Sequence, residues 1–434
     1  MKELSGKRLL VLGGTYASLD VVRTAKAMGA HVTVTDEAPV SERVAKQEAD
    51  ESRFVSTADI EALTELVKRD RIDGVFCGPS EFNIKNMIRL CQNASLPCYA
   101  TEKEWELCSD KLRMKEYCRR NSVTTAERYP LSRFVTEGAD GDVRYPVIVK
   151  PADGCSSKGI TVCHDRAATL DALEKALRFS AKGEVFAEQY IDNGGRLFGI
   201  RYILEDGKCY PYLAIDTYVA DPREKKRLIS AYTELPSELY PLYAETTDGS
   251  VRKMIADMGL KNGTVFFQTI PKDGMFYFTD MGYRLSGGMF CKITEPLLGI
   301  NDMKMMIRYA LGGEMCSSDE KTALEGFPGA FSGGVYGQLC IPLSAGRIRS
   351  VRGLEEAKRD RSVSDFLQYY REGDTVSEDV IGTLGQHFGR FTLRAESVAE
   401  LRAAAERVQK ILSITDENGS EMFTLRFDTA RAGV

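Results

Sequence analysis

Short apolar runs alternate with amphipathic helical segments over residues 7–99. The apolar runs are RLLVLG, HVTVTD, DGVFCG and LPCY. Between them, apolar residues recur three or four positions apart near 19–28, 60–68 and 82–91. This alternation is typical of βαβ units that build a parallel sheet. We therefore predict an α/β layer with a parallel sheet at the amino end, in which LPCY forms a strand.

Strand-like runs follow one another more closely in the middle of the chain. Asp165 can cap a helix predicted over 167–179. The predicted strands lie at 145–150, 160–163, 184–190, 197–204 and 210–219. The charged run DPREKKR after the last of these is most simply a solvated loop.

Residues 263–288 contain two apolar runs joined by a Lys-Asp-Gly turn, then an arginine and a Ser-Gly-Gly tail. The pattern predicts an antiparallel hairpin that turns at the Asp-Gly pair. Gln268 and Asp280 lie on opposite arms, and Arg284 follows Asp280 by two pleats. The hairpin can thus bring these three polar side chains to one place.

The carboxyl-terminal part reads as a small α/β domain without a chemical motif. A helix over 302–311 precedes a glycine-rich boundary, and a second helix is predicted over 397–411. The predicted strands of this part are VYGQLCIPL, RFTLRAE and MFTLRF. We interpret it as a docking or dimerisation layer, which leaves a homodimer open.

Composition narrows the functional classes. With 434 residues the chain is long enough for two to four domains, and 43% hydrophobic and 28% charged residues are typical of globular α/β proteins. A net charge of −5 argues against a nucleic-acid partner. Eleven cysteines without a CxxC pair favour reduced thiols and a cytoplasmic location, and no apolar run approaches the roughly 20 residues of a membrane helix. Because there are only three histidines, carboxylates, lysines, arginines and backbone amides must carry any catalysis.

Two lysines stand at positions suited to an anion. Ser109 or Asp110 can cap a helix, with Leu112, Tyr117 and Cys118 on one face, so Lys111 lies in the first turn. Lys150 ends an apolar strand just before a glycine- and serine-rich loop, whose amides can turn toward a phosphate. The loop joins two strands and lacks the Walker pattern, so a flexible linker is the alternative.

Other signals at the amino end are weaker. Gly13, Gly14 and Asp36 stand where a dinucleotide-binding turn and its ribose acid would lie, but GGTYAS lacks the third glycine. A tight strand-to-helix turn is the alternative for this segment. Glu81 and Asp216 are candidate substrate contacts, together with 230–241, although a helix-start acid equally explains Glu81.

With these pieces in order, the sequence resembles the ATP-grasp superfamily, in particular the branch of biotin carboxylase, carbamoyl phosphate synthetase, glycinamide ribonucleotide synthetase and the amino-acid ligases. The resemblance implies a mixed α/β and α+β fold. It implies a Rossmann-like domain at 1–109, an ATP-grasp domain at 110–325 with a lid at about 122–190, and an α/β domain at 326–434.

The resemblance also implies roles for individual residues. Lys111 and Lys150 would contact ATP phosphates, and the main chain around Glu188 would read the adenine edge. Asp280 and Gln268 would hold Mg²⁺, with Mn²⁺ as an alternative, and Arg284 would clamp an acyl phosphate. The loop residues implied to close over the phosphates are Gly154, Ser156, Ser157 and Lys158. The implied adenine-binding segment is Glu188, Gln189, Tyr190 and Ile191. The implied catalytic set is Arg284, Lys158, Ser286 and Gly287.

Three positions depart from the family pattern. Gln268 replaces the first metal-binding glutamate, Gly282 stands where an asparagine often lies, and Leu197 replaces a glutamate that commonly meets the ribose. An amide, one carboxylate and the phosphates can still hold Mg²⁺, but with less negative charge.

These features lead us to expect an ATP-dependent ligase that joins a small-molecule carboxylate to an amine, or to a thiol, through an acyl phosphate, releasing ADP and phosphate. The first alternative is a degenerate ATP-grasp module that binds nucleotide without turnover. The second is an NAD(P)-binding oxidoreductase that uses Gly13, Gly14 and Asp36.

Overall fold

The computed structural model describes residues 2–153, 159–219, 229–327, 329 and 333–429. The amino-terminal layer is the predicted parallel sheet, in the order β3-β2-β1-β4. Its strands are β1 (Arg8–Leu12), β2 (His31–Thr35), β3 (Glu51–Arg53) and β4 (Gly74–Cys77). Its helices are α1 (Tyr16–Met28), α2 (Val44–Glu48), α3 (Ile60–Arg69) and α4 (Glu81–Ala94), with a short 3₁₀ turn η1 (Val40–Glu42).

The predicted strand LPCY is wrong, because residues 96–99 have no regular secondary structure. Side-chain hydrogen bonds, and not strand pairing, fix the position of this segment. Tyr99 donates its hydroxyl to the Tyr283 carbonyl at 3.1 Å, and Tyr283 donates to the Tyr99 carbonyl at 2.7 Å. This reciprocal pair joins the amino-terminal layer to the end of the central hairpin.

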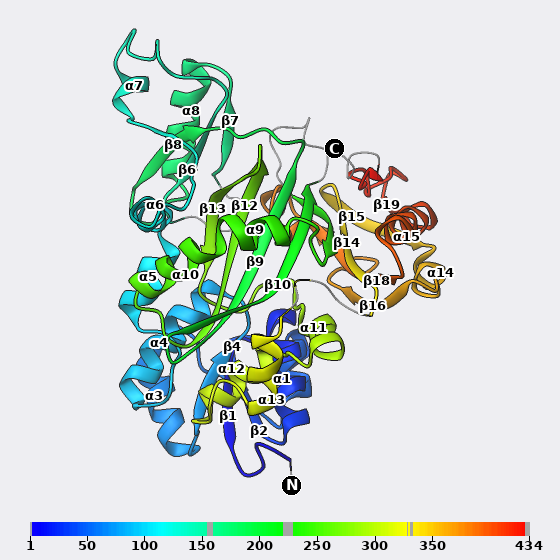
Figure 1. The fold of residues 1–434 in the computed structure, drawn as a ribbon. Helices are drawn as coiled ribbons and strands as arrows, with labels where there is room; N and C mark the ends of the chain where they lie inside the picture. Colours follow the sequence, from blue (N-terminus) through cyan, green and yellow to red (C-terminus); the bar gives the residue numbers. More distant parts are fainter. Residues whose placement is uncertain (1, 154–158, 220–228, 328, 330–332, 430–434) are drawn as a thin grey trace.

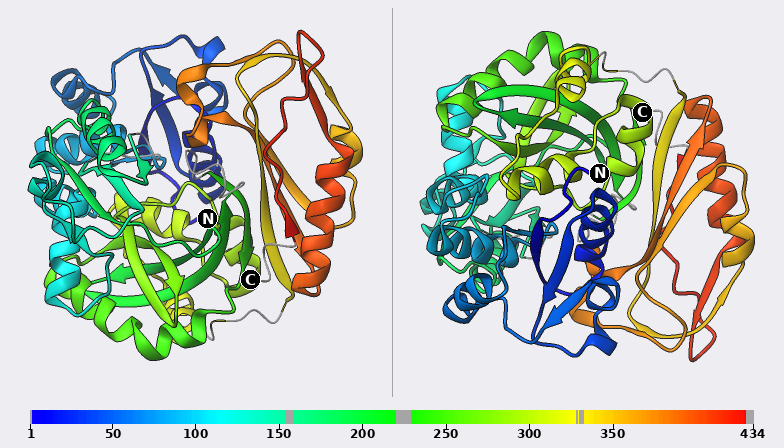
Figure 2. Two further views of the ribbon diagram at one scale, coloured as in Figure 1. Left: turned by 90° about the horizontal axis from the view of Figure 1, so that it is seen from above. Right: turned by 90° about the horizontal axis from the view of Figure 1, so that it is seen from below.

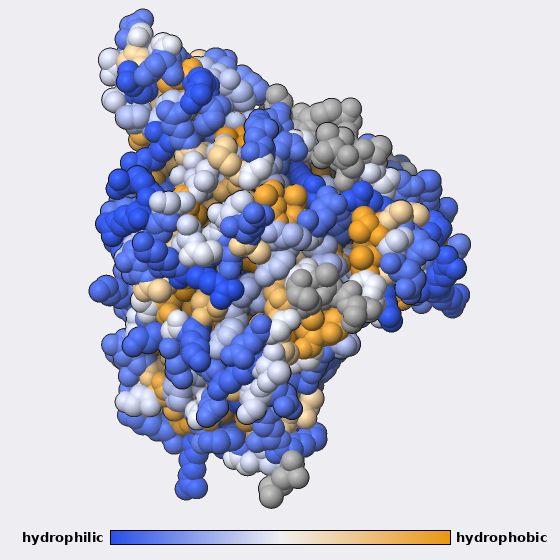
Figure 3. Space-filling model, viewed as in Figure 1, coloured by the Kyte–Doolittle hydropathy of each residue, from blue (hydrophilic) through white to orange (hydrophobic). Residues whose placement is uncertain are grey.

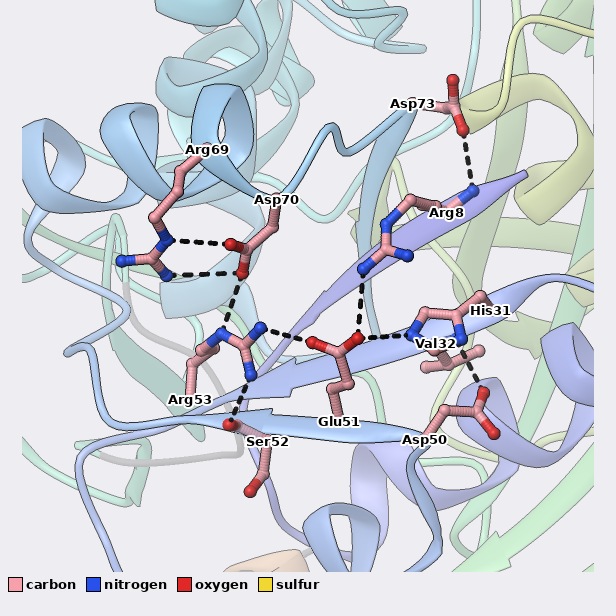
Figure 4. A network of polar contacts seen from close by, with 10 residues as sticks. All are labelled: Arg8, His31, Val32, Asp50, Glu51, Ser52, Arg53, Arg69, Asp70 and Asp73. Atoms are coloured by element: carbon pink, nitrogen blue, oxygen red, sulfur yellow. Dashed lines mark hydrogen bonds and ion pairs between the residues drawn. The ribbon is translucent and has the colours of Figure 1, made fainter. Parts of the chain in front are cut away.

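An ionic network braces one end of the parallel sheet (Figure 4). Glu51 of the edge strand β3 accepts from Arg8 of β1 at 3.2 Å and lies 2.9 Å from the His31 ring. Arg53 pairs with Asp70, at the end of α3, at 2.8 Å. Arg8 and His31 are the first residues of their strands, so the network leaves the carboxyl ends of β1, β2 and β4 for other contacts.

A large antiparallel sheet runs through the centre of the molecule, in the order β13-β12-β9-β10-β11-β14-β18-β16 (Figure 1). Its first five strands are β9 (Arg196–Glu205), β10 (Lys208–Val219), β11 (Ser230–Leu235), β12 (Gly263–Lys272) and β13 (Met275–Gly282). The remaining three are β14 (Val335–Pro342), β16 (Val363–Gln368) and β18 (His387–Ala395). The sheet therefore continues without a break across the expected boundary near residue 325.

Helices join and cover this sheet. They are α5 (Glu102–Ser109), α6 (Lys111–Arg120), α9 (Tyr240–Thr246), α10 (Asp248–Asp257), α11 (Cys291–Leu298), α12 (Asp302–Ala310) and α13 (Ser318–Glu325). Helix α12 contacts α1 and β4 on one side and β12 on the other, so it lies between the two sheets. One continuous apolar core runs through the amino-terminal layer and the central strands.

A separate four-stranded sheet projects at the top of Figure 1, in the order β5-β8-β6-β7. Its strands are β5 (Arg128–Tyr129), β6 (Val147–Pro151), β7 (Thr161–Cys163) and β8 (Val185–Gln189). Helices α7 (Ser132–Val135) and α8 (Arg166–Leu177) accompany it, and Asp165 caps α8 as expected by accepting from the Ala168 N–H at 2.8 Å. This sheet has a small apolar core of its own.

The carboxyl-terminal part packs on the far strands of the large sheet. Helix α15 (Val398–Ile411) lies along β14 and β18 (Figure 2). A small sheet, β17-β15-β19, completes it, with β15 (Gly346–Arg352), β17 (Thr375–Val376) and β19 (Ser413–Asp416). The short helices are α14 (Leu354–Lys358), η2 (Glu378–Val380) and η3 (Leu384–Gln386).

The predicted last strand, MFTLRF, is also wrong. Residues 422–427 run beside α15 without strand pairing. The Phe427 N–H donates to the Gln409 Oε1 at 2.6 Å, and Arg426 donates to the Leu412 carbonyl at 3.2 Å. At Arg426 and Phe427 this segment thus bonds to the Gln409 side chain of α15 and to the Leu412 carbonyl at the end of that helix, in place of a paired strand.

The surface in Figure 3 is mostly hydrophilic, with separate apolar patches. Over the described residues, no helix is both long and apolar enough to cross a membrane.

Candidate active site

Helix α6 places Lys111 against the central hairpin. Ser109 ends α5, and Asp110 caps α6 by accepting from the Leu112 and Arg113 N–H groups at 3.0 and 3.1 Å. The Lys111 N–H donates to the Ala152 carbonyl at 2.9 Å, just beyond β6. The Lys111 side chain is only 10% exposed, and its Nζ lies 3.0 Å from the Asp280 Oδ1. A lysine in a first turn is unfavourable to its helix, and here a carboxylate compensates it.

The hairpin forms as predicted and pairs two of its three polar residues. Gln268 of β12 lies directly opposite Asp280 of β13, so the two side chains share one face of the sheet. A bulge follows Gln268, and the Thr279 hydroxyl donates to the Gln268 carbonyl at 3.0 Å. Gln268 is exposed and the Asp280 side chain is 38% exposed, so both oxygens are open to a ligand.

Arg284 leaves the hairpin and reaches the amino-terminal layer. Its guanidinium lies 5.1 Å from the centroid of the Phe266 ring, which is two residues along β12 from Gln268. Its Nη2 donates to the Glu81 Oε1 at 3.1 Å, and its Nη1 donates to the Leu285 carbonyl at 3.0 Å. Glu81 is the first residue of α4, beyond the carboxyl end of β4. The structure therefore brings two sequence-predicted candidates, Arg284 and Glu81, into contact.

A buried triad lies behind Lys111. Glu188 of β8 is 1% exposed, accepts from Lys150 at 2.7 Å and forms an ion pair with Lys115 at 2.6 Å. Burial alone would raise the pKa of Glu188, but the two ammonium groups outweigh it and hold that pKa below its usual value. Burial lowers the pKa of Lys115. Two lysines share one carboxylate, so the triad carries one net positive charge, which suits a phosphate group.

The Ser-Gly-Gly tail of the hairpin crosses toward the carboxyl-terminal strands. Ser286 accepts from the Arg201 Nε at 3.3 Å. The Gly287 carbonyl accepts from Arg390 of β18 at 3.1 Å, and the Gly288 carbonyl accepts from Gln338 of β14 at 2.8 Å. Strands from both halves of the large sheet, β9 in one and β14 and β18 in the other, thus hold the turn in which Ser286 and Gly287 lie.

Comparison with known proteins places this fold among known ones. Residues 135–317 match the family model for the carbamoyl-phosphate synthase L chain, ATP binding domain. The structure is similar to that of the L-amino acid ligase from Bacillus licheniformis, with a TM-score of 0.76 at 20% identity over 95% of this chain and all of the other. The chain has an ATP-grasp fold.

The curated relatives are also distant in sequence. The chain is 24% identical to the 2-oxoglutarate carboxylase small subunit of Hydrogenobacter thermophilus over 350 residues, which cover 74% of this chain and 70% of that protein. It is 24% identical to the formate-dependent phosphoribosylglycinamide formyltransferase of Sulfolobus acidocaldarius over 46% of this chain, and it spans about half of that relative, 51%.

The loop expected to close over phosphates in an ATP-grasp site is largely outside the described residues. Gly154, Ser156, Ser157 and Lys158 all lie there, as does the whole of DPREKKR. The edge of the loop at Asp153 is anchored. Asp153 accepts from the Ser180 hydroxyl at 2.5 Å and from the Lys182 N–H at 3.1 Å.

The segment expected to read adenine has part of its main chain already bonded. The Gln189 N–H donates to the Glu127 carbonyl at 2.8 Å, and the Tyr190 N–H donates to the Pro146 carbonyl at 3.1 Å. These bonds engage the N–H groups of Gln189 and Tyr190, so the N–H of Ile191 is the donor of the segment to test for an adenine contact.

The acids of two other candidate sites are engaged within the fold. Asp36 accepts from the Gly14 N–H and from Arg43, each at 3.0 Å, which supports the tight-turn interpretation over a ribose site. Asp216 pairs with Arg196 at 3.0 Å and is 1% exposed, so it acts in an internal ion pair. Leu197 lies opposite Thr217 of β10 and supplies no polar group to a ribose.

The metal ligands available are few. No group of three or more His, Cys, Asp or Glu side chains suited to a metal occurs in the described part of the chain. Asp280 and Gln268 nevertheless offer two adjacent, open hard oxygens. This donor set fits Mg²⁺, which keeps several waters and takes further oxygens from phosphates.

Sequence reasoning missed Lys115 and Arg201. Lys115 follows Lys111 by four positions, so the helical period places both on one face, and this signal was available. The predicted face of α6 was partly wrong, because Lys111, Met114, Lys115 and Cys118 are buried instead of Leu112 and Tyr117. Arg201 lies within the apolar run of β9 and gave no comparable signal.

Proposed function

We propose that this chain is an ATP-dependent ligase that joins a carboxylic acid to an amine through an acyl phosphate. The observation that carries the proposal is the ladder pair of Gln268 and Asp280 with Lys111 at 3.0 Å, close to two further lysines. Phosphoryl transfer needs little covalent work from protein groups, so positioning and charge are what such a site must supply.

Different residues of the site would bind the phosphates and the metal ion. The net positive triad of Lys115, Lys150 and Glu188 would bind phosphate oxygens of ATP. Asp280 and Gln268 would hold Mg²⁺, which when bound neutralises charge on the phosphates. Lys111 pairs with Asp280 and would turn to the triphosphate once Asp280 binds the metal.

The reaction then has two balanced steps. A carboxylate oxygen attacks the terminal phosphorus of ATP, and the bond from that phosphorus to the ADP oxygen breaks. The amine nitrogen next attacks the acyl carbon, the bond from carbon to the phosphate oxygen breaks, and the amine proton passes to water or to the departing phosphate. Arg284, which stacks on Phe266 near the metal pair, is placed to neutralise the acyl phosphate. A thiol acceptor would follow the same two steps.

Product analysis tests the proposal. We expect ADP and phosphate in equal amounts when the protein is supplied with ATP, Mg²⁺ and a panel of amino acids and simple carboxylic acids. Release of AMP and pyrophosphate would refute the mechanism.

A matched pair of variants in one hairpin tests the site itself. Asp280→Asn should lower acid-dependent turnover by about 100-fold or more, since it removes the one carboxylate of the proposed metal pair. Asp273→Asn changes the same residue type at the exposed turn, where φ is 52° and asparagine is tolerated. It should leave turnover unchanged, and equal losses in both variants would place the site elsewhere.

A nucleotide-binding module without turnover is the second candidate. It is favoured by the amide at Gln268, which leaves Asp280 as the single acidic member of the proposed metal pair, and by the absence of any cluster of three metal-binding side chains in the described residues. Calorimetry separates the two functions. ATP binding that is independent of Mg²⁺, with no ADP formed from any acid in the panel, would support the module.

A further inference from the structure

Arg201 is a buried arginine on the face of the sheet that carries the candidate site. It is 8% exposed and lies in β9, opposite Phe266 of β12, which in turn lies opposite Gly282 of β13. Its Nε donates to Ser286 at 3.3 Å, and its guanidinium carbon lies 4.4 Å from the centroid of the Phe290 ring. Ring stacking and one hydroxyl therefore hold the group, and neither carries a charge.

The guanidinium lacks a counter-charge in direct contact. In the part of the chain that the structure describes, no carboxylate lies within ion-pair distance, and the buried Nη1 has no hydrogen-bond partner. Asp302, whose charge acts on Arg201, instead accepts from the Tyr212 hydroxyl at 2.7 Å. Burial lowers the pKa of Arg201 to about 10, so the group is still protonated at neutral pH. A buried charge without a partner is costly, and sites that keep one commonly use it for a ligand.

The unpartnered nitrogen lies toward the proposed reaction centre. A Cβ built on Gly199 would meet the Arg201 Nη1 at 3.4 Å, so Nη1 lies beside Gly199. Gly199 lies opposite Gln268, and Gln268 lies opposite Asp280. The side chain of Arg201 thus runs back along β9 to the strand row that carries the proposed metal ligands, two strand spacings or about 10 Å from Asp280.

We propose that Arg201, together with the Ser286 hydroxyl, binds the carboxylate of the acid substrate. A guanidinium presents parallel N–H groups that match the two oxygens of a carboxylate, and the Ser286 hydroxyl adds a further donor. Arg284 is less available for this task, because it already contacts Glu81 and the Leu285 carbonyl. The two arginines therefore divide the work, with Arg201 on the incoming carboxylate and Arg284 on the transferred phosphoryl group.

This assignment rests on the proposed ligase function, and it predicts a specific kinetic signature. Arg201→Met should raise the KM for the acid at least about 30-fold, while the Kd for ATP changes by less than about twofold. Arg201→Lys should recover part of the loss, because it restores charge without the forked geometry. An unchanged KM for the acid in Arg201→Met, or a parallel loss of ATP affinity, would overturn the assignment.

A second measurement keeps the assignment testable if no acid supports turnover. Acetate at constant ionic strength, compared with chloride, should raise the Tm of the wild-type chain and leave that of Arg201→Met unchanged. Equal shifts in both proteins, or none in the wild type, would contradict carboxylate binding at Arg201. Failure of the ligase function alone would instead appear as an acetate effect without ADP formation.

A matched arginine on the same strand provides the control for folding. Arg196 has a carboxylate partner, Asp216, at 3.0 Å, so Arg196→Met leaves a buried charge uncompensated and should lower the Tm. Arg201→Met removes a charge that has no partner, and its Tm without ligand should be unchanged or raised. A lowered Tm in Arg201→Met equal to that of Arg196→Met would indicate a structural role and count against the proposal.

Discussion

Gln268 is the residue on which the proposed activity depends most directly. It lies opposite Asp280 and supplies an amide where a carboxylate would bind Mg²⁺ more strongly. Gln268→Glu should lower the Mg²⁺ concentration for half-maximal turnover by about fivefold, because the number of charged ligands rises from one to two. ADP formation across a Mg²⁺ titration measures this. Gln268→Ala should shift the titration the other way, and no shift in either variant would mean that Gln268 does not bind the metal.

We expect the Glu188 side chain to make a large contribution to the stability of the fold. Glu188→Gln leaves Lys115 and Lys150 buried without their shared carboxylate, which should cost on the order of 3 kcal/mol of unfolding free energy. Denaturant titration at neutral pH measures the loss. Glu116→Gln on the same helix is the control, because its pair with Arg120 is exposed and contributes little. Similar losses in both variants would argue against a special role for the triad.

The same carboxylate predicts a dependence on pH. The pKa of Glu188 is lower in the folded protein than its usual value of 4.5, so its contribution to stability is present above pH 4.5. That contribution is lost as the pH falls through the folded pKa. The wild type should therefore lose stability more steeply than Glu188→Gln below about pH 5. If the free energy of unfolding fell equally steeply with decreasing pH in the two proteins, the pKa of Glu188 would not be lowered in the folded protein.

At the residue scale, the sequence pattern identified the two unusual lysines but not the carboxylates that pair with them. The strand-terminal position of Lys150 and the first-turn position of Lys111 marked both lysines as unusual. Their partners, Glu188 and Asp280, come from strands far along the chain. No local period contains such pairings, because one depends on the pairing of β6 with β8 and the other on the packing of α6 against β13.

At the scale of elements, Gly282 sets how closely β12 and β13 approach at the site. A Cβ at this position would lie 2.3 Å from the Phe266 Cζ, the ring on which Arg284 stacks. Gly282→Ala should displace the ring and cost about 1–3 kcal/mol of stability, and activity should fall with the moved arginine. Thermal unfolding and ADP formation measure the two effects.

A double variant separates crowding from other causes. Phe266→Leu provides room for the added methyl group, so Gly282→Ala should be less harmful in its presence than alone. Additive losses in the double variant would show that the ring is not what Gly282 accommodates.

The predicted elements were correct where the hydrophobic pattern was clear. They were wrong where side-chain hydrogen bonds, and not strand pairing, hold an apolar segment. The hairpin turn and the alternation of 7–94 carried strong signals, and the structure has the expected strands and helices there. The runs at 96–99 and 422–427 are as apolar as true strands, but tyrosine hydroxyls and Gln409 hold them instead. Hydrophobic content alone does not distinguish a strand from an extended segment that packs on its neighbours.

At the scale of the molecule, the site is assembled where separate parts of the chain meet. The upper sheet supplies Lys150 and Glu188, the central hairpin supplies Asp280, and the amino-terminal layer reaches Arg284 through Glu81. The order of these parts was readable from the sequence. The continuity of the large sheet from β13 to β16 was not, because it depends on pairing between β11 and β14, which lie far apart in the chain.

The contact between Glu81 and Arg284 gives the amino-terminal layer a direct influence on the site. The side chains are 35% and 17% exposed, so the pair should contribute roughly 1 kcal/mol or less to stability. Glu81→Gln should therefore unfold nearly as the wild type does. Turnover should nevertheless change by about tenfold, because Arg284 loses the group that fixes its orientation.

A second ion pair between the same parts of the chain makes the test specific. Glu3, near the amino end, pairs with Arg308 of α12, and neither residue belongs to the proposed site. Glu3→Gln should have a similar small effect on unfolding but leave turnover unchanged. If both variants altered turnover alike, the amino-terminal layer would act through general packing. If only Glu81→Gln altered turnover, the amino-terminal layer would act on the site by fixing the orientation of Arg284. The contact between Glu81 and Arg284 would then explain why this layer packs against the end of the hairpin.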